Sequence, residues 1–411
     1  MFLEKEGKLI YSYDGETVCI EAWGKDALRV RATKNRSFTG RDWALEAKDA
    51  HAGEVEIFED PSAKGGAFAN MYEGTDTSYG KITNGKLHAV IDSGSVITFY
   101  HEDGRVLLKE HFRRLRDEES MPLNIMGREY SNGVGDNFRI VARFVARKGE
   151  KIFGMGQYQQ HELDLKGCML ELAQRNSQVS VPFYLSSIGY GFLWNNPGVG
   201  QVMFANNGTE WVTESGKEID YLVIAGDTPA EIEENYMTLT GKPPMMPEYG
   251  MGFWQCKLRY WNQEQLLSVA RKYKELGVPL DVIVVDFFHW TKQGEFKFDP
   301  KYWPDVPGMC RELKEMGIQV VVSVWPTVDI YSENFEEMKE KGYLVRTEHG
   351  VPLTMLCGGN EVFFDATNPD ARTYVWEKIK KNYYDQGAKL FWLDVAEPEY
   401  SVYDFRNYRY Q

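Results

Sequence analysis

The fold is decided by the stretch Lys389-Leu390-Phe391-Trp392-Leu393-Asp394-Val395-Ala396-Glu397-Pro398-Glu399. An apolar run of strand length follows Gly387 and ends in acids and a proline, which cannot continue a central strand. The pattern predicts a buried parallel strand with Asp394 at its C-terminal end, where the chemistry of α/β barrels is located. A carboxylate held there can serve as a nucleophile. It can equally cap the next helix, and the stretch alone favours neither interpretation.

The chain before this stretch alternates between strand and helix patterns from about residue 249. Strands are predicted at 249–257, 282–286, 319–325 and 390–394. Helices are predicted at 262–276, at 333–341 and at 370–386, and a further helix follows the loop 291–300 and ends near Gly317. Such alternation indicates a parallel sheet, and the second strand is apolar on both faces, as buried parallel strands are. Because a whole eight-stranded barrel takes roughly 250 residues, these four units predict its first half.

The part of the chain before residue 240 shows a different pattern, typical of antiparallel strands. The run Ala27–Ala32 alternates with period two, and Asn84-Gly85 is a hairpin dipeptide between two further runs. The pairs of runs at 96–100 and 106–108, and at 181–185 and 189–194, continue the pattern. Many short strands separated by turn residues predict a β-sandwich.

A proline-rich linker separates the two patterns. Residues 229–239 predict a helix with Thr228 as its N-cap and Pro229 at the first helical position. The segment Gly241-Lys242-Pro243-Pro244-Met245-Met246-Pro247 follows. We therefore expect a β-sandwich domain at 1–242 and the first half of a catalytic barrel at 243–411.

Composition excludes several classes of protein. The net charge of −14 argues against nucleic-acid binding, which needs a basic face. The five cysteines lie far apart without a CxxC pair, as expected of reduced thiols in a cytoplasm rather than of a disulfide framework or zinc site. Neither a signal peptide nor an apolar stretch of membrane-spanning length is seen. We expect a cytoplasmic protein without metal, cofactor, nucleic-acid or membrane partner; homo-oligomerisation stays open.

Acidic and aromatic residues gather at the predicted strand ends. Carboxylates bind paired hydroxyls and aromatic rings cover the apolar face of a sugar, so this pattern predicts a sugar pocket. A retaining glycosidase uses one carboxylate as nucleophile and a second, roughly 5–5.5 Å away, as acid and then base. The candidate residues, in chain order, are Phe253, Trp254, Lys257, Asp286, Trp290, Trp325 and Asp394.

Five ordered motifs resemble glycoside hydrolase family 31, the family of α-glucosidases and α-xylosidases. They read Gly252-Phe253-Trp254-Gln255, Val284-Val285-Asp286 with Trp290, Ser323-Val324-Trp325-Pro326, Phe364-Asp365-Ala366-Thr367-Asn368-Pro369 and Trp392-Leu393-Asp394-Val395-Ala396-Glu397. In the first domain, the segment from Arg175-Asn176-Ser177 to Trp194-Asn195-Asn196 is similar to the one that leads into the family's barrel. The resemblance covers most of the chain from about residue 150.

The resemblance implies a role for each candidate residue. Asp394 would be the nucleophile that forms a covalent glycosyl-enzyme, and Asp286 would bind hydroxyls of the sugar. The other expected substrate-binding residues are Trp325, Trp254, Phe253, Trp290 and Trp392. The family's acid/base lies downstream of the next strand, so we expect it beyond Gln411. On this expectation residues 1–411 are the N-terminal portion of a longer enzyme and do not turn over substrate alone.

The expected activity is that of a retaining α-glycoside hydrolase that releases a sugar from the non-reducing end of an oligosaccharide or α-glycoside. The alternatives are a non-catalytic carbohydrate-binding protein and an α-transglycosylase. The sequence does not choose among xylose, glucose and galactose, although Gly154–Gln157 and Gln174–Leu185 look similar to family α-xylosidases. We interpret His289 as a loop or subsite residue rather than a metal ligand, and Asp365 as structural.

Overall fold

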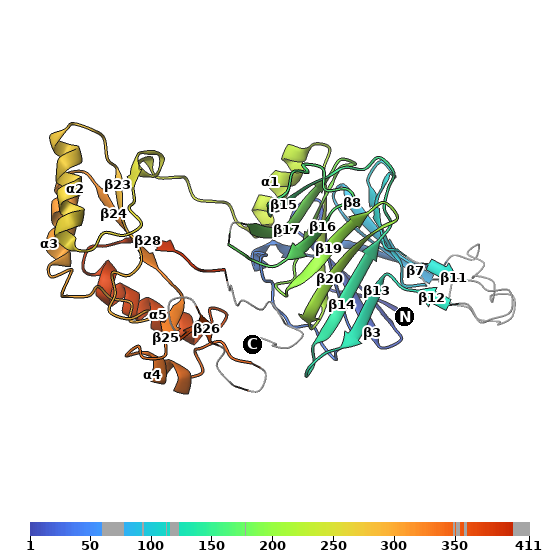
Figure 1. The fold of residues 1–411 in the computed structure, drawn as a ribbon. Coiled ribbons are helices and arrows are strands. Elements are labelled where there is room, and N and C mark those ends of the chain that lie inside the picture. The colour runs from blue at the N-terminus through green and yellow to red at the C-terminus, as the bar shows by residue number, and fades with distance from the viewer. Residues whose placement is uncertain are drawn as a thin grey trace. The chain divides into compact units, whose positions relative to one another are not determined.

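The computed structural model describes residues 1–59, 78–92, 94–111, 113–115, 123–176, 178–347, 350, 354–356 and 360–397. Ser177, Pro398 and Glu399, which belong to the quoted sequence segments, and Cys357, one of the five cysteines, lie outside these residues. The chain divides into two compact units, Met1–Pro243 and Pro244–Gln411, which are described separately (Figure 1).

Antiparallel sheets form the first unit. The largest has the order β1-β2-β3-β4-β21-β18-β17-β15, with bounds Phe2–Lys5, Lys8–Tyr13, Glu16–Trp23, Ala27–Thr33, Ile219–Ala225, Tyr190–Trp194, Val179–Ser186 and Ile152–Gln157. A second has the order β13-β14-β20-β19-β16, with bounds Arg128–Asn132, Phe138–Phe144, Gly208–Gly216, Gly200–Ala205 and Met169–Leu172. A third has the order β10-β9-β8-β7-β6, with bounds Val106–Lys109, Ile97–His101, Leu87–Ile91, Ser78–Asn84 and Glu54–Glu59.

Smaller elements complete this unit. The short strand β5 (Ala50–His51) pairs with β3, and β11 (Arg113–Leu115) pairs with β12 (Leu123–Ile125). The helix α1 (Pro229–Thr240) begins after Thr228, whose side chain accepts a hydrogen bond from the Glu231 N–H, as the sequence predicts. The Asn84-Gly85 hairpin is also confirmed, with Gly85 at a φ of 57° between β7 and β8.

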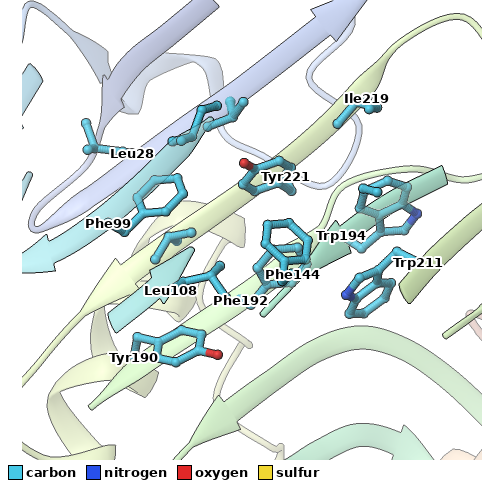
Figure 2. Close-up of a cluster of buried hydrophobic side chains, with 14 of the residues drawn as sticks. Leu28, Phe99, Leu108, Phe144, Tyr190, Phe192, Trp194, Trp211, Ile219 and Tyr221 are labelled. Atoms are coloured by element: carbon cyan, nitrogen blue, oxygen red, sulfur yellow. The ribbon is translucent and has the colours of Figure 1, made fainter. Parts of the chain in front are cut away.

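Aromatic side chains fill the core between the sheets (Figure 2). The ring of Trp211 on β20 stacks on Trp194 and Phe192 of β18 at centroid distances of 5.5 and 5.1 Å. The Tyr221 ring on β21 meets Phe144 of β14 edge to face at 5.4 Å. All five are buried, so the predicted β-sandwich is confirmed, and the aromatic content of this unit largely serves its core.

The predicted strand at Ala27–Ala32 is confirmed as β4, and one of its charged side chains, Arg29, is fully buried. The guanidinium lies 2.6 Å from an Asp220 oxygen and 2.7 Å from an Asp42 oxygen. A buried charge needs such partners, and they come from a distant strand and from a loop.

A parallel sheet with the order β22-β23-β24-β28 organises the second unit. Helices follow its strands, as the half-barrel prediction requires, and the prediction is confirmed (Figure 1). The elements in chain order are β22 (Trp254–Gln255), α2 (Gln263–Glu275), β23 (Val282–Val285), α3 (Val306–Glu315), β24 (Gln319–Val324), β25 (Thr327–Asp329), α4 (Phe335–Glu340), β26 (Met355–Leu356), β27 (Asn360–Phe363), α5 (Pro369–Ile379) and β28 (Leu390–Leu393).

The two faces of this parallel sheet have different neighbours. Ile283, Val285, Val320 and Val322 pack with apolar residues of α2, α3 and α5 in one cluster. Val282, Val284 and Val321 form a separate cluster on the opposite face, together with Tyr249 and Leu390. We call this second face the inner face, because in a closed barrel the face away from the helices is the interior.

Three parts of the second unit differ from the predicted elements. The first strand has two residues rather than nine, because Glu248–Met251 forms a 3₁₀ turn before it. The last helix ends at Ile379 and continues as a π-helical turn over Lys380–Tyr384. A small antiparallel sheet, β25-β27-β26, was not predicted. Among the described residues, no helix combines the length and the apolarity that crossing a membrane requires.

Candidate active site

Asp394 directly follows β28, at the C-terminal end of the parallel sheet. Its N–H donates to the Val324 carbonyl at 3.1 Å, and its Oδ2 accepts a hydrogen bond from Trp325 Nε1 at 3.1 Å. Both partners belong to the end of β24, so the neighbouring strand holds the backbone and the carboxylate together. Oδ1 receives no hydrogen bond from the described residues.

Asp286 occupies the corresponding place after β23. Its Oδ1 accepts a hydrogen bond from the Phe287 N–H at 2.7 Å, and its Oδ2 lies 3.3 Å from the Cys256 Sγ, which donates. The side chain is partly exposed. Asp286 stands one residue beyond the last pair of β23 with β24, Val285–Val322. Asp394 likewise stands one residue beyond the last pair of β24 with β28, Val324–Leu393. Both carboxylates therefore lie past the ends of the paired strands.

An aromatic cluster joins the two strand ends. Trp325, the ring that donates to Asp394, stacks on Phe287 with centroids 5.4 Å apart. Trp290 meets the same ring edge to face at 5.5 Å, and Phe288 lies 6.2 Å from it. Two of the predicted site residues, Trp325 and Trp290, are thus brought into contact with each other, and Trp325 also contacts one of the acids, Asp394.

Two residues beside the acids have unfavourable backbone conformations. Phe288, two residues after Asp286, has a φ of 58°, and Val395, directly after Asp394, has a φ of 54°. The left-handed region costs a β-branched residue such as Val395 free energy, and such outliers gather at functional sites.

Other predicted residues lie elsewhere on the sheet. Trp254 and Trp392 line a hollow of about 440 Å³ on the inner face together with Val321 and Leu390. Neither Asp286 nor Asp394 lines that hollow. Since Trp254 pairs in register with Val282, it lies toward the beginning of the strands rather than at the end that carries the acids.

Phe253 does not share a face with Trp254. Its ring stacks on Tyr273 of α2 at 5.8 Å, and its N–H donates to Asp281 at 3.0 Å. The side chain therefore packs toward the helices, which does not support its expected place in the sugar pocket. Alternation along a strand explains the difference, because neighbours in sequence point to opposite faces.

His289 is a buried structural residue. Its Nδ1 lies 2.9 Å from the Asp286 carbonyl oxygen and its Nε2 lies 2.9 Å from the Tyr383 hydroxyl, on the π-helical turn. Burial lowers the pKa of the imidazole to about 4. His289 thus ties the loop that carries Asp286 to a distant segment, which sequence spacing does not reveal.

We expect His289 to make stability depend on pH. The unfolded chain binds the proton with a pKa near 6.5 and the folded chain only near 4, so the contribution is complete above about pH 6.5 and is lost as the pH falls toward 4. Between about pH 7.5 and pH 5 the free energy of unfolding should fall by roughly 2 kcal/mol. His289→Gln should flatten this part of the curve in urea titrations followed by fluorescence. His161→Gln, at an exposed site, is the control and should leave the dependence of the unfolding free energy on pH unchanged. If the two variants showed the same dependence on pH, the assignment to His289 would be contradicted.

The sequence interpretation did not single out Cys256, Phe287, Phe288 or Arg259. Cys256 could have been found by strand alternation, since it stands two residues after the inner-face Trp254. Arg259 lies over the Trp261 ring at 3.6 Å and the Phe288 ring at 5.4 Å, contacts that only the tertiary structure reveals. Within the described ranges, no three His, Cys, Asp or Glu side chains gather closely enough to hold a metal ion.

Comparison with protein-family models agrees with this arrangement. Residues 243–410 match the "Glycosyl hydrolases family 31 TIM-barrel domain", and residues 17–202 match the "Glycosyl hydrolase 31 N-terminal galactose mutarotase-like domain". The two matches fall on the two units of the structure.

Individual relatives point in the same direction. The chain is 45% identical to an uncharacterized family 31 glucosidase, ORF2, of Pseudescherichia vulneris, over 99% of this chain and 76% of the relative. It is 31% identical to α-xylosidase A of Aspergillus niger, over 93% of this chain and 52% of that enzyme. A crystal structure of a GH31 α-xylosidase from a soil metagenome, complexed with xylose, matches with a TM-score of 0.89 and 49% identity, over 100% of this chain and 60% of the other. The chain thus spans roughly half to three quarters of these relatives.

Proposed function

Since the chain belongs to glycoside hydrolase family 31, we propose that the protein hydrolyses α-glycosides from the non-reducing end and retains the configuration of the released sugar. The observation that carries the proposal is the pair of carboxylates, Asp286 and Asp394, beyond the C-terminal ends of parallel strands. This is the end at which barrel enzymes hold their catalytic groups. The Trp325 ring, which contacts both strand ends, supports it further.

In the proposed mechanism Asp394 is the nucleophile. Its unbonded Oδ1 attacks the anomeric carbon as the bond to the leaving oxygen breaks, and the Trp325 N–H holds Oδ2 in place. Water then cleaves the covalent glycosyl-aspartate, and the two inversions together retain the configuration. None of residues 1–411 is assigned the role of the acid that protonates the leaving oxygen.

Sugar recognition is assigned to Asp286 and the aromatic cluster. The partly exposed carboxylate can accept hydrogen bonds from two hydroxyls, while Trp325 and Trp290 offer ring faces to the apolar side of the sugar. Trp254 and Trp392 line a separate hollow, so we propose for them a supporting place on the inner face. The domain division at residue 242 remains our proposal for where the sandwich ends and the catalytic half-barrel begins.

We propose xylose as the preferred sugar. Four relatives that are 31–34% identical are named α-xylosidases, and the similar soil-metagenome enzyme was crystallised with xylose. The alternative, glucose, is favoured by the name of the Pseudescherichia vulneris relative. The cytoplasmic location and the lack of nucleic-acid and membrane partners stay predictions from composition.

The test is hydrolysis of nitrophenyl α-xyloside and α-glucoside by the protein expressed from its complete coding sequence. We expect release of nitrophenol with a higher kcat/KM for the xyloside, and α-xylose as the first product in proton NMR. Initial release of β-xylose would contradict retention. Binding without turnover would favour the non-catalytic alternative, and transfer of xylose to added acceptor sugars in place of water would favour transglycosylation.

A further inference from the structure

We propose that Cys256 is a positioning residue that orients the Asp286 carboxylate for sugar binding. The inference rests on the proposed function, because it assigns to Cys256 an effect that acts through the sugar-binding role of Asp286. Nothing in the sequence motifs marks this cysteine, and it makes no disulfide.

Strand geometry places the thiol beside the carboxylate. Cys256 follows β22 and stands two residues after Trp254, so it points to the inner face. Gln255, between them, points the other way and accepts a hydrogen bond from Tyr273 of α2 at 2.8 Å. On the adjacent strand Asp286 stands two residues after the inner-face Val284. The two side chains therefore meet on one face of the sheet.

The carboxylate of Asp286 is held at both oxygens. The Cys256 S–H donates to Oδ2, with 3.3 Å between Sγ and the oxygen, while the Phe287 N–H donates to Oδ1 at 2.7 Å. Two donors from different strands define the plane of the carboxylate. Each oxygen can accept about two hydrogen bonds, so one position on each stays open for a sugar hydroxyl.

The thiol is suited to donate rather than to react. Burial, together with its hydrogen bond to the Asp286 carboxylate, raises the pKa of Cys256 to about 12, so the sulfur keeps its proton at neutral pH. The Lys257 carbonyl oxygen, 3.6 Å from Sγ, is the competing acceptor. The shorter distance and the negative charge favour Asp286 as the acceptor of the single S–H proton.

The alternative interpretation is that Cys256 only fills space. Substitutions that separate volume from hydrogen bonding distinguish the two. Cys256→Val approximates the volume without a donor, Cys256→Ser restores a donor, and Cys256→Ala provides a second donor-free variant if valine disturbs folding. Cys310→Ala is the control, because Cys310 is another free thiol of the same unit, half-buried on α3, whereas Cys256 is exposed.

The assay uses nitrophenyl α-xyloside and the protein expressed from its complete coding sequence. We expect Cys256→Val and Cys256→Ala to raise KM roughly 5- to 10-fold, because each variant loses about one hydrogen bond. The kcat should change less than about 2-fold, and Cys256→Ser should recover most of the loss in KM. Cys310→Ala should behave as the parent protein. An unchanged KM in both donor-free variants, or a serine variant as impaired as valine, would overturn the proposal.

A double-mutant cycle with Asp286→Asn tests whether Cys256 acts through Asp286. We expect Cys256→Val to add less than about 2-fold to the defect of Asp286→Asn, because the two residues form one interacting pair. Fully multiplied effects would overturn the role of Cys256 and leave the proposed function intact. If Asp286→Asn itself left kcat/KM unchanged, the sugar-binding role of Asp286 would fail instead, and the positioning role of Cys256 with it.

Discussion

Asp394→Asn is expected to lower kcat at least about 10⁴-fold while the protein stays folded. An amide oxygen is too weak a nucleophile to form the glycosyl-enzyme. Folding should persist because asparagine keeps an oxygen that can accept the Trp325 Nε1–H bond and keeps the backbone bond to Val324. The loss should therefore appear in kcat with little change in the unfolding midpoint.

Covalent trapping identifies the nucleophile directly. A fluorinated xylosyl fluoride should inactivate the parent protein, and peptide mass spectrometry should locate the label on Asp394. The Asp394→Asn variant should remain unlabelled, whereas Asp370→Asn, at an exposed site on α5, should be labelled as efficiently as the parent. A label on any other carboxylate would show that Asp394 is not the nucleophile.

The second large effect is expected at Asp286. Charge-assisted hydrogen bonds contribute roughly 1.5–3 kcal/mol each. Asp286→Ala removes both acceptor oxygens, so kcat/KM should fall about 100-fold or more, at about 1.4 kcal/mol for each factor of ten.

Steady-state kinetics with nitrophenyl α-xyloside measures this loss, and Asp370→Ala is the control at an exposed carboxylate. The free energy of unfolding should change less than the activity, because the side chain is partly exposed and accepts hydrogen bonds from only the Phe287 N–H and the Cys256 S–H among the described residues. If kcat/KM stayed at the parent value, Asp286 would be a strand-end cap without a part in recognition.

Local patterns were enough to predict much of the second unit. The helices α2 and α5 begin after the N-caps Asn262 and Asn368, and β23 and β24 end within one residue of the predicted positions. The positions of Asp286, Trp325 and Asp394 at strand ends followed from these elements, since the C-terminal ends of parallel strands meet at one edge of a sheet.

Sequence patterns failed where a residue's surroundings come from distant segments. Arg29 belongs to an alternating strand, yet Asp220 and Asp42 allow it to be buried. His289 lies in a loop, as predicted, but the sequence does not reveal that Tyr383 gives it a buried partner 94 positions away. The small sheet β25-β27-β26 has strands too short for a periodic pattern to stand out.

The sequence by itself determined the order of strands and helices, the change from antiparallel to parallel structure, and the acids that end the parallel strands. These are consequences of periodicity, caps and turn residues, which act over a few positions. Only the tertiary structure decided which face each side chain occupies, and thereby separated Phe253 from Trp254 and joined Cys256 to Asp286. The physical reason is that the face depends on strand pairing and helix packing, which bring together residues tens of positions apart.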